Sequence, residues 1–255
     1  MSVKSNDKLQ FDKVRVKKSM AEKTAAIILA GGKGSRMQSD VHKQYIKIND
    51  KPILYYTLKA FEASVVDALI IVCGKGEIDF CRREIVEKYH INKVTAITEG
   101  GKERYNSVYE GLKMVNNAEI TLIHDGARPF VTGEMIQKNI EAARRYRACI
   151  TAVRSKDTIK ISDADGIVQY TPDRRYVWNV QTPQTFQTPL IREAYEKLMQ
   201  QPVDGITDDA MVVETVLKYP VKIVEGNYTN LKITTPEDLP IAQILVDNLT
   251  KKHNI

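Results

Sequence analysis

Residues 25–36 read AAIILAGGKGSR, an unbroken apolar run followed by three glycines within four positions. A short run of this kind predicts a β-strand that is buried on both faces of a sheet. The glycines allow the backbone to approach a ligand closely, and successive N–H groups in such a loop can hold phosphate oxygens. The stretch lacks the Gly-x4-Gly-Lys-Ser/Thr pattern of a P-loop and the third glycine of a dinucleotide fingerprint. We therefore expect a phosphate-binding loop of another class directly after the first strand.

Short apolar strands and amphipathic helices alternate along the rest of the chain. We expect further strands at residues 68–72, 94–98, 120–124, 150–153 and 221–224. We expect helices at residues 52–63, 78–89, 103–115, 132–147, 189–199, 208–218 and 236–248. Strand–helix alternation with short connections predicts an α/β fold with a single doubly wound, mostly parallel sheet.

The alternation breaks at about residue 154, where two short runs flank a turn. Residues 158–161 read TIKI, residues 167–170 read IVQY, and Gly166 ends the turn between them. This pattern predicts a β-hairpin. A hairpin that projects from an α/β sheet can serve as a lid or as an arm between subunits, and the alternative is an ordinary edge hairpin.

The length of 255 residues and the 43% hydrophobic content fit one folded domain. The net charge of +6 is concentrated in residues 1–23, which carry seven lysine or arginine residues and three acidic ones. We expect a solvated N-terminal tail at residues 1–23 and one domain at residues 24–255, with the hairpin at about 154–176. A polyanion anchor is the alternative interpretation of the tail.

The sequence also bears on location. No stretch is apolar for long enough to cross a membrane, and we expect no secretory signal. The three cysteines and four histidines are scattered and show no zinc-ligand spacing. This pattern favours a reducing, cytoplasmic compartment.

Charged residues follow several expected strands, where open α/β sheets bind their ligands. Arg36 and Lys43 beside the glycine-rich loop suit a triphosphate, and the alternative is two surface cations. The glycine pair that begins the GGKER run at residues 100–104 either forms a simple turn or allows the backbone to contact a base edge, with Ser107 one helical turn further on.

Residues 124–130 read HDGARPF. Asp125 is a candidate for a metal or a substrate hydroxyl and Arg128 for an anion, and the alternative is an Asp–Arg pair that braces a turn. Lys232 stands alone in an uncharged stretch, as either a surface lysine or a phosphate ligand. No Ser-His-Asp or Cys-His arrangement is evident, which disfavours hydrolysis by a nucleophile. The combination of a glycine-rich loop, several cationic side chains and one aspartate indicates phosphoryl-transfer chemistry.

These motifs, taken in order, resemble those of the 2-C-methyl-D-erythritol 4-phosphate cytidylyltransferases, nucleotidyltransferases of non-mevalonate isoprenoid synthesis. The resemblance covers about residues 24–248 and rests on AGGKGSRM at 30–37, KQ at 43–44, GGKER at 100–104, HDGARP at 124–129, QTPQ at 181–184 and NLKIT at 230–234. Ribitol 5-phosphate cytidylyltransferases look similar, but Ala127 and GITDDA at 205–210 favour the methylerythritol enzymes. His42 and Gly31 stand where this family usually has proline and alanine.

The resemblance implies a Rossmann-like nucleotidyltransferase that transfers CMP from CTP to a polyol phosphate with Mg2+. The Mg2+ would be held mainly by the CTP phosphates, with Asp125 nearby. The implied catalytic residues are Arg36 and Lys43 at the α-phosphate and Arg174 and Lys232 at the acceptor phosphate. The implied CTP-binding residues are Leu29, Ala30, Gly31, Gly32, Gly34, Gly101, Lys102, Ser107, Asp125 and Gly126. The implied acceptor-binding residues are Asp125, Arg128, Thr158 and Thr182.

The resemblance further implies a homodimer in which the hairpin arm completes the partner's site. Three alternatives stay open at this point. The acceptor could be D-ribitol 5-phosphate, the protein could be a CTP-binding regulatory module without turnover, or the basic tail could bind nucleic acid. We expect no specific nucleic acid and no membrane as partners, because the basic excess lies in the tail and not on a folded face.

Overall fold

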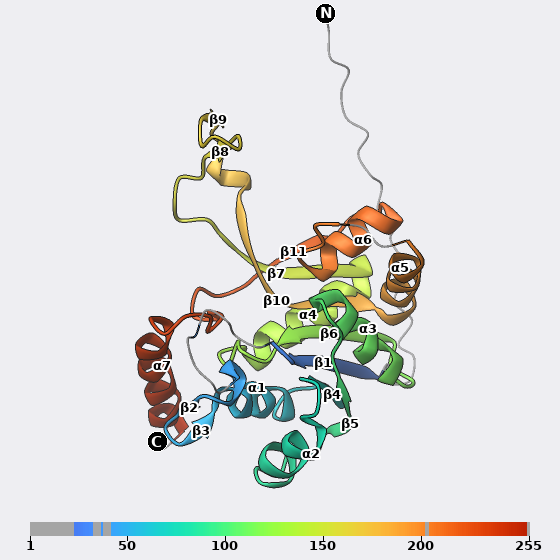
Figure 1. The fold of residues 1–255 in the computed structure, drawn as a ribbon, viewed down its shortest axis with the longest axis vertical. Helices are drawn as coiled ribbons and strands as arrows, with labels where there is room; N and C mark the ends of the chain where they lie inside the picture. Colours follow the sequence, from blue (N-terminus) through green and yellow to red (C-terminus); the bar gives the residue numbers. More distant parts are fainter. Residues whose placement is uncertain (1–22, 33–36, 38–41, 202–203, 254–255) are drawn as a thin grey trace, which may run out of the picture.

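The computed structural model describes residues 23–32, 37, 42–201 and 204–253. Its centre is a seven-stranded sheet in the order β11-β7-β10-β6-β1-β4-β5 (Figure 1). The strands are β1 (Thr24–Ala30), β4 (Ala68–Cys73), β5 (Val94–Glu99), β6 (Ile120–Asp125), β7 (Ala148–Arg154), β10 (Trp178–Gln187) and β11 (Lys222–Glu225). Neighbouring strands are parallel except at β10, which is antiparallel to both β6 and β7. The expected mostly parallel α/β sheet is thereby confirmed.

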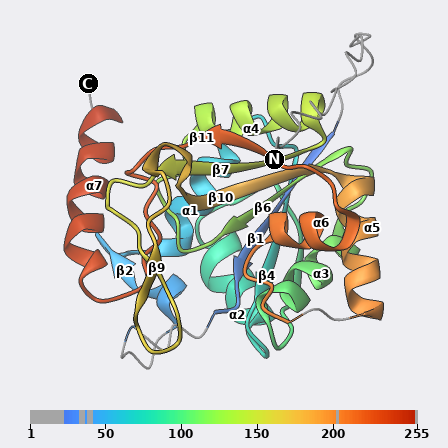
Figure 2. The ribbon, with the colours of Figure 1, turned by 90° about the horizontal axis from the view of Figure 1, so that it is seen from above.

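Helices cover both faces of this sheet (Figure 2). One face carries α1 (Ile53–Glu62) and α4 (Gly133–Tyr146). The other carries α3 (Arg104–Met114), α5 (Thr188–Gln200) and α6 (Asp209–Leu217). Strand β1 shows why its sequence is apolar throughout: Ala26 and Ile28 enter the first core, whereas Ala25 and Ile27 enter the second. Alternate side chains of a strand point to opposite faces, so both sets are buried.

A third, smaller core attaches the C-terminal helix α7 (Asp238–His253) to the body. There it packs beside the short strands β2 (Lys47–Ile48) and β3 (Lys51–Pro52) (Figure 1). Ile233 is fully buried in this core together with Ala242 and Val246 of α7. The segment before α7 therefore reaches the carboxyl end of the sheet in a defined position. Within the described chain, no helix is both long enough and apolar enough to cross a membrane.

Two local expectations need correction. The helix expected at 78–89 begins as α2 (Ile78–Phe80) and continues as a π-helical segment at Cys81–Glu87. The expected hairpin is present but short, because only β8 (Ile161–Ser162) and β9 (Val168–Tyr170) pair. Both strands are exposed, and their segment projects away from the sheet (Figure 1). With no core contact along this segment, the apolar alternation alone does not extend the ladder.

The local sequence does not predict strand β10, in which residues 181–184 stand out only as a motif. Its sequence, WNVQTPQTFQ, contains a proline and many polar residues, which argue against a central strand. A register shift between Val180 and Gln184 accommodates Pro183, whose peptide bond with Thr182 is cis. Gln184 is buried because its Oε1 accepts the N–H groups of Asp209 and Ala210, both at 2.9 Å. Tertiary hydrogen bonds thus stabilise a strand that its local sequence disfavours.

Candidate active site

A cavity of about 610 Å³ lies where β1, β4, β5 and β6 end. This volume is typical of a small-molecule binding site. Among the described residues, its wall contains five basic side chains and two acidic ones, namely Lys43, Lys75, Lys102, Arg104 and Lys232 against Glu103 and Asp125. The positive excess favours a ligand with several negative charges.

Two glycines in the cavity wall pack closely against neighbouring groups. A Cβ atom on Gly31 would lie 2.9 Å from the carbonyl oxygen of Cys73. A Cβ atom on Gly100 would lie 2.6 Å from Oγ of Ser107. Both distances are shorter than van der Waals contact, so a larger residue would displace either loop. The backbone itself therefore forms this part of the wall and can present peptide groups to a ligand.

Ser107 lines the cavity from the first turns of α3. Its hydroxyl accepts the N–H of Gly101 at 3.1 Å and donates to the carbonyl of Glu103 at 3.2 Å. Glu103 and Asn106 form the capping box that begins this helix. Ser107 therefore also holds the 100–103 turn in place.

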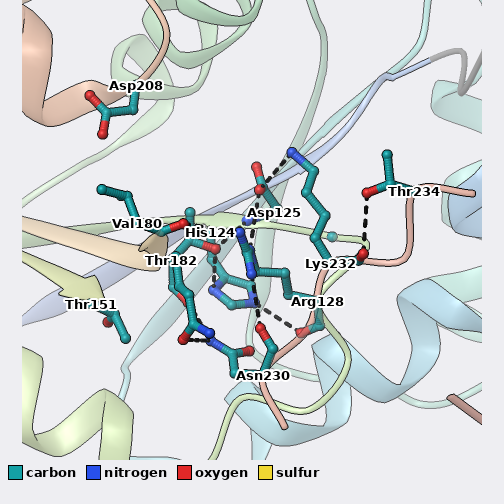
Figure 3. Close-up of polar contacts among 12 residues, drawn as sticks. His124, Asp125, Arg128, Thr151, Val180, Thr182, Asp208, Asn230, Lys232 and Thr234 are labelled. Carbon is teal, nitrogen blue, oxygen red and sulfur yellow. Dashed lines mark hydrogen bonds and ion pairs between the residues drawn. The ribbon is translucent and has the colours of Figure 1, made fainter. Parts of the chain in front are cut away.

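Asp125, the last residue of β6, lies at the centre of a group of cations (Figure 3). Its Oδ2 is 2.9 Å from Nζ of Lys232 and 3.5 Å from Nε of Arg128. Its Oδ1 is 3.8 Å from Nε of Arg104. Burial by itself would raise the pKa of this carboxyl, but Lys232, Arg104 and Arg128 together lower the pKa well below its usual range. Asp125 is therefore a carboxylate at neutral pH.

Arg104 connects this centre to the start of α6. Its Nη1 and Nη2 donate to the two carboxylate oxygens of Asp209 at 2.8 and 2.7 Å. Asp209 is fully buried and also accepts the hydroxyl proton of Tyr195 at 2.6 Å. Burial opposes the charge of Arg104, but Asp209 and Asp125 outweigh it and raise the pKa of the guanidinium. A bidentate pair of this kind holds Arg104 in one orientation.

His124, beside Asp125 in β6, is buried and neutral. Its Nε2 lies 3.1 Å from the carbonyl of Arg128, and because a carbonyl only accepts, Nε2 carries the proton. Burial lowers the pKa of His124 to about 4, so Nδ1 is an acceptor at neutral pH. The hydroxyl of Thr182 therefore donates to Nδ1 at 3.0 Å and accepts the N–H of Asp125 at 3.1 Å. These bonds connect Thr182 of β10 to the start of the turn at His124 and Asp125, and His124 in turn connects to Arg128 at its other end.

Hydrogen bonds also join the segment that carries Lys232 to this turn (Figure 3). Nη1 of Arg128 donates to the carbonyl of Asn230 at 2.8 Å, and Nδ2 of Asn230 donates to the carbonyl of Thr182 at 2.9 Å. Within the described residues, Nε of Arg128 and Oδ1 of Asn230 are buried without a hydrogen-bond partner. Neither residue lines the described cavity, and Nε of Arg128 faces the carboxylate of Asp125 at 3.5 Å.

The structure gathers some of the expected residues and separates others. Nine line the cavity: Leu29, Gly31, Gly32, Lys43, Gly101, Lys102, Ser107, Asp125 and Lys232. Arg128 and Thr182 lie directly behind Asp125. Thr158 and Arg174 are exposed on the projecting arm and do not line the cavity. Gly34 and Arg36 fall outside the described residues.

Ala30 and Gly126 lie beside the cavity but not in its described wall. The carbonyl of Ala30 accepts the side-chain amide of Gln44. The N–H of Gly126 donates to Leu29 at 2.8 Å, and its carbonyl accepts the hydroxyl proton of Thr57 at 2.9 Å. The N–H and the carbonyl of Gly126 are therefore both hydrogen-bonded within the protein and are not available to a ligand. The site needs a small residue at this position.

Sequence reasoning missed four cavity residues with functional groups, namely Gln44, Lys75, Glu103 and Arg104. The signal for Arg104 was present, since the GGKER motif ends on it at the start of an expected helix. Its partner Asp209 was not deducible, because nothing local indicates which acid a distant arginine will meet. Lys75 follows β4 in a short loop that carried no recognisable motif.

The described residues contain no group of three or more histidine, cysteine, aspartate or glutamate side chains that could hold a metal ion. Asp125 is the acidic residue nearest to the expected role, but its two oxygens already face three cations. Those cations would repel a metal ion that had only the carboxylate of Asp125 as a ligand. A divalent cation would therefore have to arrive with negative charges of its own.

Comparison with known proteins gives consistent matches. The family model of 2-C-methyl-D-erythritol 4-phosphate cytidylyltransferase matches residues 24–248. The enzyme of that name from Lachnoclostridium phytofermentans is 49% identical over 225 residues, covering 88% of this chain and 97% of that protein. The one from Alkaliphilus oremlandii is 51% identical over 224 residues, covering 87% and 94%. The crystal structure of 4-diphosphocytidyl-2C-methyl-D-erythritol synthase from Anaerococcus prevotii aligns with a TM-score of 0.79 at 38% identity, covering 89% and 96%.

Proposed function

This chain belongs to the 2-C-methyl-D-erythritol 4-phosphate cytidylyltransferase family, and on that premise we propose how its residues carry out the reaction. The enzyme transfers CMP from CTP to 2-C-methyl-D-erythritol 4-phosphate and gives CDP-methylerythritol and pyrophosphate. Of the two acceptors that the sequence left open, the methylerythritol phosphate is therefore the one supported. Membership of this enzyme family also argues against the alternative of a CTP-binding module without activity.

The observation that carries the residue assignment is the single cavity that holds Lys43, Asp125 and Lys232 together. We assign the CTP phosphates to Lys43, to Arg36 and to the glycine-rich loop after β1. Lys102 and the glycine pair at 100–101 bind the remainder of the nucleotide. Cations at the α-phosphate are worth on the order of 10²–10³ in rate when they are preorganised.

We assign the acceptor to the Asp125 centre. Lys232 binds the acceptor phosphate, and the ionised Asp125 accepts a hydrogen bond from a polyol hydroxyl. Asp125 and Lys232 both line this end of the cavity, which supports a charged, hydroxyl-bearing acceptor there. The hydroxyl of Thr182 already serves His124 and Asp125, so Thr182 acts mainly by holding this centre.

The reaction needs no general base. A phosphate monoester has a second pKa of about 6, so its oxygen is already a nucleophile at neutral pH. That oxygen attacks the α-phosphorus of CTP, a new P–O bond forms, and the bond to the β-phosphate oxygen breaks as pyrophosphate leaves. The obstacle is the repulsion between two polyanions, and the five basic side chains of the cavity reduce it.

We propose that Mg2+ enters as the Mg–CTP complex and is held by the phosphates. The three cations around Asp125 support this assignment over a metal ion held by that carboxylate. Bound in this way, Mg2+ would neutralise part of the triphosphate charge.

We further propose that the arm at residues 154–176 reaches a second subunit, where Thr158 and Arg174 complete the acceptor site. Exposed apolar side chains on the arm support an interface, since Ile167 and Tyr176 are 64% and 78% exposed. The three buried free cysteines fit a reducing environment, and we propose a cytoplasmic location.

Pyrophosphate release by the purified protein with CTP and Mg2+ tests the function. We expect turnover with 2-C-methyl-D-erythritol 4-phosphate and a much lower kcat/KM with D-ribitol 5-phosphate. A preference for ribitol phosphate would show that the acceptor is a different polyol phosphate from the one proposed. Binding of CTP without turnover on either acceptor would contradict the enzymatic function itself.

A further inference from the structure

Glu77 lies just after β4 and has one carboxylate that contacts three different groups. Its Oε2 accepts the backbone N–H of Gly74 at 2.9 Å and the hydroxyl proton of Tyr45 at 3.0 Å. Its Oε1 lies 2.5 Å from Nδ1 of His42, which is ion-pair distance, although the angles are not those of a hydrogen bond. The Glu77 side chain is only 18% exposed, so these contacts are shielded from solvent.

Two of these three partners flank Lys43 in the sequence. His42, Lys43, Gln44 and Tyr45 form a single 3-10 turn with its N-cap at His42. The rings of His42 and Tyr45 lie nearly parallel, with centroids 6.4 Å apart and 12° between their planes, and both residues place a polar atom near the carboxylate of Glu77. Lys43 lies between them and lines the cavity.

The loop that receives this turn is shaped for the carboxylate. A Cβ atom on Gly74 would lie 2.7 Å from Oε2 of Glu77, so no other residue fits at position 74 without moving the glutamate. The N–H of Glu77 in turn donates to the carbonyl of Gly74 at 3.1 Å. Phe80 packs edge-on against Tyr45, with ring centroids 4.9 Å apart. The turn is therefore held by the carboxylate of Glu77 and by the aromatic contact with Phe80.

We propose that Glu77 is a positioning residue that holds the Lys43-bearing turn, through His42 and Tyr45, in the orientation that binds the triphosphate of CTP. This inference rests on the proposed role of Lys43. A flexible lysine loses much rotamer freedom when it binds a phosphate, and a fixed backbone reduces the part of that cost that binding must overcome. Burial, together with Cys81 and Glu77, raises the pKa of Tyr45 far above its usual value, so its hydroxyl stays protonated and keeps donating.

The test is a double-mutant cycle between Glu77→Gln and Lys43→Ala, read as kcat/KM for CTP. Glutamine keeps the shape and one acceptor oxygen but removes the charge. We expect Glu77→Gln to lower kcat/KM for CTP on the order of 10–100-fold and to change KM for the methylerythritol phosphate less than twofold. In the Lys43→Ala background, the same change should cost less than twofold, because the cation being positioned is gone.

Tyr45→Phe removes only one hydroxyl and provides a second variant should Glu77→Gln fold poorly. Tyr45→Phe should raise KM for CTP, which changes kcat/KM in the same direction as Glu77→Gln does. In the Lys43→Ala background this effect should disappear as well. Glu84→Gln is the matched control, since Glu84 is an exposed glutamate in the following helical segment and pairs only with Lys88 at 2.9 Å among the described residues. It should leave every kinetic constant unchanged.

Two results overturn the inference, and they differ from each other. Equal losses from Glu77→Gln with and without Lys43 would show that Glu77 supports the fold and not the lysine. A nearly normal kcat/KM for Lys43→Ala would remove the proposed role of Lys43 itself, while the pyrophosphate assay would still report whether the enzyme turns over.

Discussion

The ammonium group of Lys232 and the carboxylate of Asp125 lie 2.9 Å apart, although the two residues come from opposite halves of the chain. The contact is built by backbone pairing, because the N–H of Ile233 donates to the carbonyl of Ala127 at 2.9 Å. Ile233 is itself buried against α7. A hydrophobic anchor and one hydrogen bond thus place the lysine over the end of β6.

Lys232→Met should lower kcat/KM for the methylerythritol phosphate by about 10²–10³, the usual effect of removing a preorganised charge. Arg104 and Arg128 still face the buried carboxylate of Asp125 in this variant, so the protein should remain folded, which its melting temperature would check. Steady-state kinetics with the acceptor varied would measure the effect. Lys222→Met, at an exposed lysine of β11, should behave as wild type. Full activity of Lys232→Met would refute the assignment.

Asp209→Asn should destabilise the protein by about 3–5 kcal/mol, because it leaves the bidentate partner of Arg104 without its counter-charge. Urea unfolding monitored by circular dichroism would give the free energy of unfolding. As a matched control, Glu134→Gln breaks the exposed pair with Lys138 and should leave that free energy nearly unchanged. Equal effects of the two variants would mean that burial of Asp209 is unimportant.

His124 should make the protein lose stability in mild acid. Its pKa is about 4 in the folded state and about 6.5 when unfolded. Between these values the unfolded chain binds the extra proton, so the free energy of unfolding falls as the pH drops from 6.5 to 4. The loss from this residue should be roughly 3 kcal/mol. The free energy of unfolding, measured at several pH values in this range, should depend less on pH for His124→Asn than for the wild type. The same pH dependence in both proteins would contradict the argument.

Thr182→Val keeps the shape of the side chain and removes its hydroxyl. The N–H of Asp125 and Nδ1 of His124 would then both lack their partner. We expect a loss of about 1–3 kcal/mol for each unsatisfied group, together with a higher KM for the acceptor. Thr182→Ser should restore most of both properties. A valine variant as stable as wild type, with only KM raised, would instead assign the hydroxyl to the substrate.

Mixing two inactive variants tests whether the arm acts across subunits. If Arg174 serves the partner's site, a mixed dimer of Arg174→Ala and Lys232→Met subunits contains one site with both native residues. Activity should therefore appear after the two variants are unfolded and refolded together, and should approach a quarter of the wild-type value for equal, random pairing. No recovery, despite dimers in analytical ultracentrifugation, would place Arg174 in the site of its own subunit.

Local patterns in the sequence were enough for the parallel strands, most of the helices and the glycine-rich loops. Strand β1 is an example, since both of its faces are buried and every residue from Ala25 to Ala30 is apolar. The position of Asp125 at the end of β6 followed from the same alternation, whereas the roles expected of Lys43 and Lys232 came from the family resemblance. The motif order was sufficient to indicate the family, which the comparisons then showed.

Other features depend on contacts between distant segments, and only the tertiary structure decided them. Strand β10 forms despite Pro183 because Gln184 is satisfied by the start of α6. Arg104 finds Asp209, and Thr182 finds His124, through pairings that leave no local signal. The sequence by itself determined most of the strands and helices, because apolar periodicity is a local property. The folded structure decided which polar groups are buried together, because the cost of burying each one is offset by a partner far along the chain.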